Sequence, residues 1–159
     1  MKTFNYHVAK DSKEASKLSS SSSTFLAGGM TSIPSMKLGL ATYKDVIDIK
    51  HIKKLSGIKV SGKSVTIGAT TKHAEVANSK NVQKAIPSLA KLAGGIGDAQ
   101  VRNRGTVGGS IANNDPSACY PSACMALNAI IHTNNRKIEA AKFFKGMFET
   151  ALKKGELIE

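Results

Sequence analysis

The sequence predicts an α+β fold, and three observations support this class. Apolar and polar residues alternate near the N-terminus, at Phe4, Tyr6 and Val8, with the period of a half-buried strand. A second alternation flanks residues 61–64, and a third flanks residues 134–135, so that each pair of segments indicates a hairpin. An α/β opening combined with later hairpins, without internal repeats, is typical of an α+β protein.

The opening of the chain predicts a β-α-β unit. After the alternating strand, Asp11 and Glu14 form a capping box that starts a short helix. The serine run 19–23 ends this helix and begins a loop, because fewer than 20 residues precede it and a flexible linker needs a domain on each side. A second strand over 24–27 then ends abruptly in the pair Gly28-Gly29.

The later elements are short and are separated by turn residues. Residues 30–41 form a loop with helical tendency, and Pro87 suits the first turn of a helix. The predicted elements are a strand over 45–49, a hairpin over 58–69, two helices within 73–93, a helix over 123–127, a hairpin over 128–140 and a helix over 143–152.

Composition limits the possible functions. The 159 residues fit one ordinary domain or two small lobes sharing one core. The net charge is +12, yet the lysines are spread along the chain without interleaved aromatics, which favours a solvated surface over a nucleic-acid interface. No apolar run reaches the roughly 20 residues of a membrane span, and the N-terminus lacks the apolar centre of a signal peptide. We therefore expect a cytoplasmic protein without membrane insertion.

Side chains that commonly carry catalysis or bind metal ions form no pattern here. The four histidines are scattered without metal-ligand spacing, and each is expected to be a surface or core residue. Cys119 and Cys124 fit neither a CxxC pair nor a secreted disulfide framework. The sequence thus predicts no catalytic acid–base pair and no metal site.

Three glycine pairs stand out: 28-29, 94-95 and 108-109. Glycine permits positive φ and removes the Cβ that would keep a ligand away from the backbone, so successive amides can bind oxyanions. Hydroxyl residues lie beside the first and third pairs, which favours a diphosphate site built from two facing turns. Each pair could instead be only a tight turn, and for Gly94-Gly95, at a helix end, that is the favoured interpretation. No G-x-G-x-x-G or P-loop motif is present.

Larger segments make a family resemblance visible. AGGMTSIPSMKLGLA, DVIDI, VTIGATTKHAEV, IPSLAKLAGGIGDAQVRNRGTVGGSIANNDPSACYPSA and FFKGMFETALKKGELI occur in that order. Together they resemble the FAD-binding medium subunit of molybdenum hydroxylases, particularly the aerobic carbon monoxide dehydrogenase type. The resemblance extends from Phe4 to Ile158.

The resemblance implies a fold and a domain organisation. Residues 1–159 would form an FAD-binding domain of the type found in p-cresol methylhydroxylase (PCMH) and vanillyl-alcohol oxidase (VAO). A small α/β lobe would cover approximately 1–55, and a larger lobe with a mainly antiparallel sheet would cover 56–159, with the flavin between them. Members of the family continue into a C-terminal domain of roughly 100 residues, a usual domain size, which is expected to be absent here.

The resemblance also implies which residues contact FAD. The first diphosphate loop would be 27–31, and the second 106–110. Positions 96 and 97 match residues close to the flavin ring, and positions 113 and 115 match the segment along the ribityl chain. The implied cofactor-binding residues are Ala27, Gly28, Gly29, Met30, Thr31, Ile96, Gly97, Thr106, Val107, Gly108, Gly109, Ser110, Asn113 and Asp115.

In this family the medium subunit takes electrons from [2Fe-2S] clusters of a small subunit and passes them to an external acceptor. A large subunit holds the molybdopterin cofactor. The resemblance therefore implies an oxidoreductase flavoprotein subunit in a hetero-oligomer. Cys119 stands where relatives commonly have an aspartate near the ribityl hydroxyls, and a thiol is a weak hydrogen-bond partner. This departure, with the expected absence of the C-terminal domain, leaves an alternative: a remnant domain retained as a non-catalytic interaction module. Arg102 and Arg104 are expected to brace their loop rather than touch the cofactor.

Overall fold

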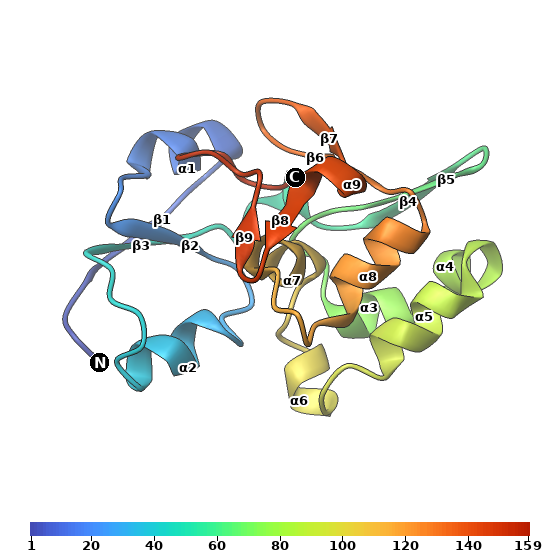
Figure 1. The fold of residues 1–159 in the computed structure, drawn as a ribbon, viewed down its shortest axis with the longest axis horizontal. Helices are drawn as coiled ribbons and strands as arrows, with labels where there is room; N and C mark the ends of the chain where they lie inside the picture. Colours follow the sequence, from blue (N-terminus) through green and yellow to red (C-terminus); the bar gives the residue numbers. More distant parts are fainter.

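The computed structural model describes residues 1–159 and begins with a three-stranded parallel sheet in the order β1-β3-β2. Strand β3 lies in the centre because its residues 46–48 are apolar or fully paired and are buried on both sides. Helix α1 and the short α2 flank the sheet (Figure 1). The elements are β1 (Asn5–Val8), α1 (Ser12–Leu18), β2 (Ser23–Leu26), α2 (Ser32–Lys37) and β3 (Asp45–Asp48).

The N-cap predicted at Asp11 is present, but the capping box is only half formed, because Glu14 accepts from Lys10 N and not from the N-cap amide of Asp11. Asp11 Oδ1 accepts a hydrogen bond from the amide of Glu14 (2.8 Å), and Glu14 Oε2 accepts one from the amide of Lys10 (2.7 Å). The alternating residues of β1 are less buried than the pattern predicts, since Tyr6 and Val8 are each about half exposed. Tyr6 stays at the surface because its hydroxyl donates to Asp48, a fully buried carboxylate.

The rest of the chain combines short helices with three antiparallel strand pairs. The antiparallel pairing expected of this part is found, although it is divided among separate two-stranded sheets rather than gathered in one. The elements are η1 (Lys53–Leu55), β4 (Ile58–Ser61), β5 (Ser64–Ile67), α3 (His73–Asn78), α4 (Lys80–Ala85), α5 (Pro87–Gly94), α6 (Ala99–Arg102), α7 (Val107–Asn113), α8 (Cys119–Ala126), β6 (Ile130–His132), β7 (Lys137–Glu139), α9 (Ala140–Phe143), β8 (Phe144–Gly146) and β9 (Glu149–Thr150).

Two helix predictions are corrected by the structure. Residues 73–94 form three helices instead of two, because Ser79 ends α3 and its hydroxyl caps α4 by accepting from Val82 N (3.3 Å). The single helix predicted over 143–152 is wrong. Its first residue ends α9, and residues 144–150 form the hairpin β8–β9, in which Phe148 has a φ of +57°.

Two hydrophobic clusters hold these elements together. The small core comprises seven buried residues, six of which lie between positions 9 and 55, while the seventh is Leu157. The large core comprises fifteen buried residues between positions 69 and 158, including Tyr120 and Phe143. The chain thus leaves the small core near Leu55 and returns to it close to its end. Division into lobes at residues 55 and 56 stays a prediction.

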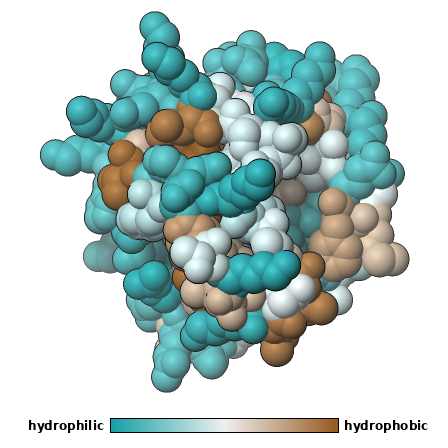
Figure 2. Space-filling view, turned by 90° about the vertical axis from the view of Figure 1, so that its left-hand side faces the viewer, coloured by the Kyte–Doolittle hydropathy of each residue, from teal (hydrophilic) through white to brown (hydrophobic).

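The outer surface of the sheet end of the molecule is mainly hydrophilic. Figure 2 shows this face with hydrophobic residues in small separate patches among polar ones. Exposed apolar residues of the N-terminal part include Tyr6, Val8, Leu38 and Leu40. None of the helices combines the length and apolar character that crossing a membrane requires.

Candidate functional site

The turn that follows β2 contains a run of main-chain amides without protein acceptors. None of the N–H groups of residues 27–32 donates a hydrogen bond within the protein. Carbonyl groups of the same turn start α2, because Gly29 O accepts from Ile33 N (3.0 Å) and Thr31 O accepts from Ser35 N (3.1 Å). The left-handed φ of Gly29, +74°, is one that glycine adopts without steric cost. Free amides at the carboxyl end of a parallel strand suit the oxygens of a phosphate.

Gly28 brings this turn against a distant part of the chain. A Cβ added at Gly28 would lie 2.1 Å from Arg104 O and 2.9 Å from Gly105 Cα. Both neighbours are backbone atoms, so no side-chain rotation could make room. Because residues 104 and 105 directly precede Thr106, the two glycine motifs that the sequence singles out lie side by side.

The second glycine motif is the first turn of helix α7 and not the open turn that the sequence predicts. Thr106 is the N-cap residue of this helix. The four amides of residues 107–110 are all used within the protein, and they donate in order to Thr71 O, Ala69 O, Thr106 Oγ1 and Thr106 O at 3.0, 2.8, 3.2 and 3.1 Å. The expectation that both turns offer free amides is therefore wrong for the second one.

Gly108 is required here for packing. A Cβ at this position would lie 2.5 Å from the Cβ of Ala69 and 2.8 Å from its carbonyl oxygen. Because Gly108 has no side chain, α7 can approach the turn after β5 closely. The hydroxyl of Ser110, two residues further on, makes no hydrogen bond within the protein and remains available.

A cavity of about 490 Å³ lies beside these motifs and is lined by residues of both hydrophobic cores. Twelve of the fourteen sequence-predicted residues line it. They are Ala27, Gly28, Gly29, Met30, Thr31, Ile96, Thr106, Gly108, Gly109, Ser110, Asn113 and Asp115.

The two remaining predicted residues lie outside the cavity lining. Val107 is 6% exposed and belongs to the large core, since the first residue of α7 turns its side chain inward. Gly97 is exposed, with a φ of +51°, and forms part of the loop before α6. Asp115 lines the cavity and also shapes its own loop, because its Oδ1 accepts from Ser117 N (2.8 Å).

Arg102 braces the loop that carries Ile96 and Gly97. Its Nη1 donates to Ile96 O (3.0 Å) and to Gly97 O (2.9 Å). Arg104 makes no side-chain hydrogen bond or ion pair and is exposed. The bracing role expected for the two arginines therefore applies to Arg102 alone.

Replacement of Arg102 by alanine is expected to loosen this loop while the fold is kept. Loss of two charge-assisted hydrogen bonds at a partly exposed site should lower the free energy of unfolding by about 1 kcal/mol. Binding of a ligand in the cavity should weaken by roughly three- to tenfold, the equivalent of about 0.7–1.4 kcal/mol. Urea unfolding and flavin titration measure the two effects. The Arg104→Ala variant is the matched control, and an equal loss in that variant would contradict the bracing role.

The cavity contains residues that sequence reasoning did not select. His73 lines it, is 5% exposed, packs against Tyr120 (ring centroids 5.3 Å apart) and has an Nδ1 atom without a partner. Burial lowers the pKa of the His73 imidazole, which favours its neutral form. Residues Glu156, Leu157 and Ile158 form another part of the wall. The sequence does not mark these residues as part of a binding site, because each one's place in the cavity depends on its tertiary neighbours.

The cysteines do not form a site with one another. Cys119 is exposed at the first position of α8, whereas Cys124 is buried in the large core, where burial raises the pKa of its thiol to about 11. The cavity is lined by the two residues before Cys119 and not by Cys119 itself. Groups of three or more His, Cys, Asp or Glu side chains that could hold a metal ion do not occur in the structure.

Known proteins are similar to this chain in sequence and in fold. The family model described as the FAD binding domain in molybdopterin dehydrogenase matches residues 2–159. The glyceraldehyde dehydrogenase medium chain of Sulfolobus acidocaldarius is 37% identical over 161 residues, which cover 98% of this chain and 57% of that protein. The carbon monoxide dehydrogenase medium chain of Hydrogenophaga pseudoflava is 39% identical over 162 residues, with 98% and 56% covered.

Solved structures agree with the sequence matches. A chain of carbon monoxide dehydrogenase from Hydrogenophaga pseudoflava superposes with a TM-score of 0.95 at 39% identity, over 99% of this chain and 57% of that one. Quinoline 2-oxidoreductase from Pseudomonas putida 86 gives a TM-score of 0.95 at 28% identity, over 99% and 58%. The chain spans somewhat more than half the length of these relatives. It belongs to the family of FAD-binding domains of molybdopterin dehydrogenases, with FAD as its cofactor.

Proposed function

We propose that this chain is the FAD-binding part of a medium subunit in a molybdenum hydroxylase resembling carbon monoxide dehydrogenase. In this role it takes electrons from the [2Fe-2S] clusters of a small subunit and passes them to an external acceptor. A molybdopterin-containing large subunit completes the hetero-oligomer, which acts in the cytoplasm. The observation that carries the proposal is the run of free amides at residues 27–32, which faces a cavity shared with the second glycine motif.

The residues of the cavity fit a dinucleotide. Free amides of residues 27–32 would hold the diphosphate, and the hydroxyls of Thr31, Ser32 and Ser110 would add donors, because none of them is used within the protein. The close backbone contact between Gly28 and Arg104 keeps the two motifs next to each other at the cavity. Ile96, held by Arg102, would contact the ring, and Asn113 with Asp115 would lie along the ribityl chain.

Bound FAD supplies the redox chemistry, while the protein supplies binding, orientation and exclusion of water. The chain needs no acid–base residues of its own for this task. Its relatives include a medium chain of glyceraldehyde dehydrogenase and one of carbon monoxide dehydrogenase. The substrate of the whole complex would be selected by the large subunit.

Binding of FAD by the purified chain is the direct test. We expect one FAD per chain, with affinity falling from FAD to FMN and again to riboflavin, because the free amides are directed at phosphate oxygens. Fluorescence titration with the three flavins measures this order. Equal binding of FAD and riboflavin would contradict the role assigned to residues 27–32. Absence of all flavin binding would favour the alternative, an interaction module without a cofactor.

A further inference from the structure

The segment 155–158 connects the two hydrophobic cores beside the cavity. Leu157, 3% exposed, packs in the small core, whereas its neighbour Ile158, 8% exposed, packs in the large core. Gly155 lies so close to α1 that an added Cβ would be 3.1 Å from Ser16 Oγ. Figure 1 shows this red segment reaching from β8 and β9 across to α1 and then back to the C-terminus.

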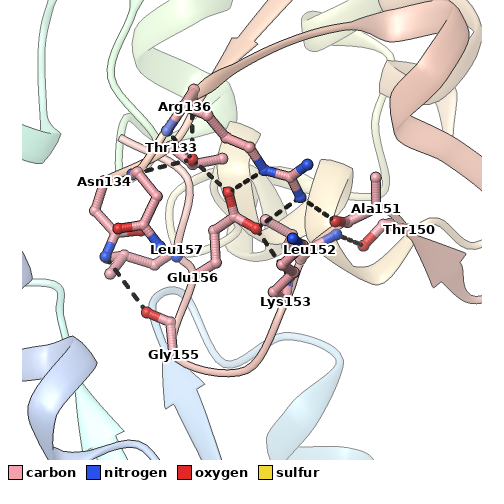
Figure 3. Close-up of polar contacts among 11 residues, drawn as sticks. Thr133, Asn134, Arg136, Thr150, Ala151, Leu152, Lys153, Gly155, Glu156 and Leu157 are labelled. Atoms are coloured by element: carbon pink, nitrogen blue, oxygen red, sulfur yellow. Dashed lines mark hydrogen bonds and ion pairs between the residues drawn. The ribbon is translucent and has the colours of Figure 1, made fainter.

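Glu156 fixes this segment to the turn between β6 and β7. Its carboxylate has no exposed surface and is surrounded by donors (Figure 3). Arg136 binds it with two nitrogens, Nε to Oε1 (2.8 Å) and Nη2 to Oε2 (2.9 Å). Thr133 Oγ1 donates to Oε1 (2.7 Å), and Lys153 N donates to Oε2 (2.9 Å). Every oxygen of this buried anion is therefore satisfied, as burial of a charge requires.

The same turn holds the segment through its backbone as well. Asn134 N donates to Leu157 O (3.1 Å), and Asn134 Oδ1 accepts from Leu157 N (3.0 Å). Arg136 Nη2 additionally donates to Ala151 O (2.6 Å). Residues 133–136 thus bind residues 151–157 through hydrogen bonds at several positions (Figure 3).

Segment 151–158, held in this way, also forms part of the wall of the cavity. Leu152, Glu156, Leu157 and Ile158 line it, together with the glycine turns that the sequence identifies. A shift of this segment would move Leu157 relative to the small core and would change the distance between the two cores on either side of the cavity. The position of the wall therefore depends on the buried ion pair together with the backbone bonds of Asn134.

We propose that Arg136 and Glu156 are positioning residues, which set the spacing of the two cores and thereby shape the cavity for FAD. This inference rests on the proposed function, because it takes FAD as the occupant. The pair acts through Leu157 and Ile158 and does not itself hold the flavin phosphates. It differs from an ordinary stabilising ion pair in one respect: weakening it should change the geometry between the cores while each core stays folded.

The test uses Glu156→Gln and Arg136→Lys in the full chain. The first removes the charge and keeps the shape of the side chain, whereas the second keeps a cation and loses the planar two-point contact. Glu139→Gln is the matched control, because the Glu139–Lys142 pair (2.8 Å) lies in the same region and both of its side chains are mostly exposed. FAD affinity is measured by titration, and thermal unfolding of the FAD-free proteins shows whether each variant folds.

The spacing of the cores is measured directly by pulsed electron paramagnetic resonance. Spin labels at Lys13→Cys in α1 and Lys91→Cys in α5 report the distance between the two parts of the molecule, in a Cys119→Ser background that removes the exposed thiol. We expect a broader distance distribution in both variants without FAD, and FAD binding weakened at least about tenfold. The control should match the parent protein in both measurements.

The results distinguish failure of the positioning role from failure of the proposed function. Parent-like distances and affinities within about twofold in folded variants would overturn the positioning role, and so would weaker binding without any change in distances. If Glu156→Gln does not fold, Arg136→Lys decides alone by the same two readouts. If the parent protein binds no FAD, the proposed function fails, and unchanged distances in the variants would then separately refute the positioning of the cores.

Discussion

Replacement of Gly28 by alanine is expected to reduce FAD affinity at least about 100-fold. The added Cβ would meet Arg104 O at 2.1 Å, Arg104 C at 2.8 Å and Gly105 Cα at 2.9 Å. These are backbone atoms, so the turn 27–32 would have to move away from residues 104–105 and take its free amides with it. A 100-fold loss corresponds to about 2.8 kcal/mol, which lies within the roughly 1–3 kcal/mol that overpacking costs.

The matched control is Gly94→Ala. Gly94 ends α5, and a Cβ there would meet only the Cβ of Ala77, at an ordinary 3.7 Å. Alanine in a helix loses less conformational entropy on folding than glycine does, so stability should stay equal or rise by up to about 1 kcal/mol. Flavin titration and urea unfolding of both variants separate the effects. FAD binding by Gly28→Ala at parental affinity would show that the contact between the two motifs does not shape the site.

Local signals account for the parts of the fold that the sequence predicts correctly. The N-cap at Asp11 depends on neighbouring residues alone, and it is present, although Glu14 accepts from Lys10 N instead of closing the predicted capping box. Strand β3 and the hairpins β4–β5 and β6–β7 follow from apolar periodicity and turn residues, and they too are present. In these elements the signals act over a few neighbouring residues, and no contact from elsewhere in the chain competes with them.

The region 143–152 shows why other elements could not be predicted. Its composition favours a helix, but Asn114 Nδ2 donates to Gly146 O (2.7 Å) and to Glu149 O (2.9 Å). Phe148 N in turn donates to Asn114 O (3.1 Å). These bonds from a residue about 30 positions earlier stabilise a hairpin in place of a helix. The tertiary partner therefore decides the local structure.

In the candidate site, too, local signals predict some features, whereas tertiary contacts decide others. The glycine motifs predict that residues 27–31 and 106–110 lie together, and the structure places them beside one cavity. The sequence cannot tell that the amides at 107–110 are already used by Thr71, Ala69 and Thr106, because these acceptors depend on how α7 packs. The buried carboxylate of Glu156 was missed for a similar reason: a charged residue near the end of a lysine-rich segment gives no sign that Arg136 will cover it.

Acidification is expected to weaken the fold through Glu156, as well as through Asp45, Asp48 and Glu139, whose pKa values are also lowered. Hydrogen bonds from Arg136, acting against burial, lower the pKa of the Glu156 carboxyl to about 2, well below its ordinary value of 4.5. A carboxyl whose pKa is lower in the folded state contributes stability that is fully present above its unfolded pKa. That stability is lost as the pH falls through the folded value. The contribution is up to roughly 3 kcal/mol, and its loss should occur between about pH 4.5 and about pH 2.

Comparison of the parent protein with Glu156→Gln isolates this contribution. Glutamine carries no charge at any pH, so the variant should be less stable near neutral pH, where the parent carboxylate binds the Arg136 guanidinium. The gap between the two free energies of unfolding should narrow steadily below about pH 4.5 as the parent carboxylate becomes protonated. Asp45, whose pKa is lowered by hydrogen bonds from His7 and Asn5, is present in both proteins and cancels in the comparison. Urea unfolding at a series of pH values measures the gap, and a gap independent of pH would show that the buried charge of Glu156 is not what holds segment 155–158 in place.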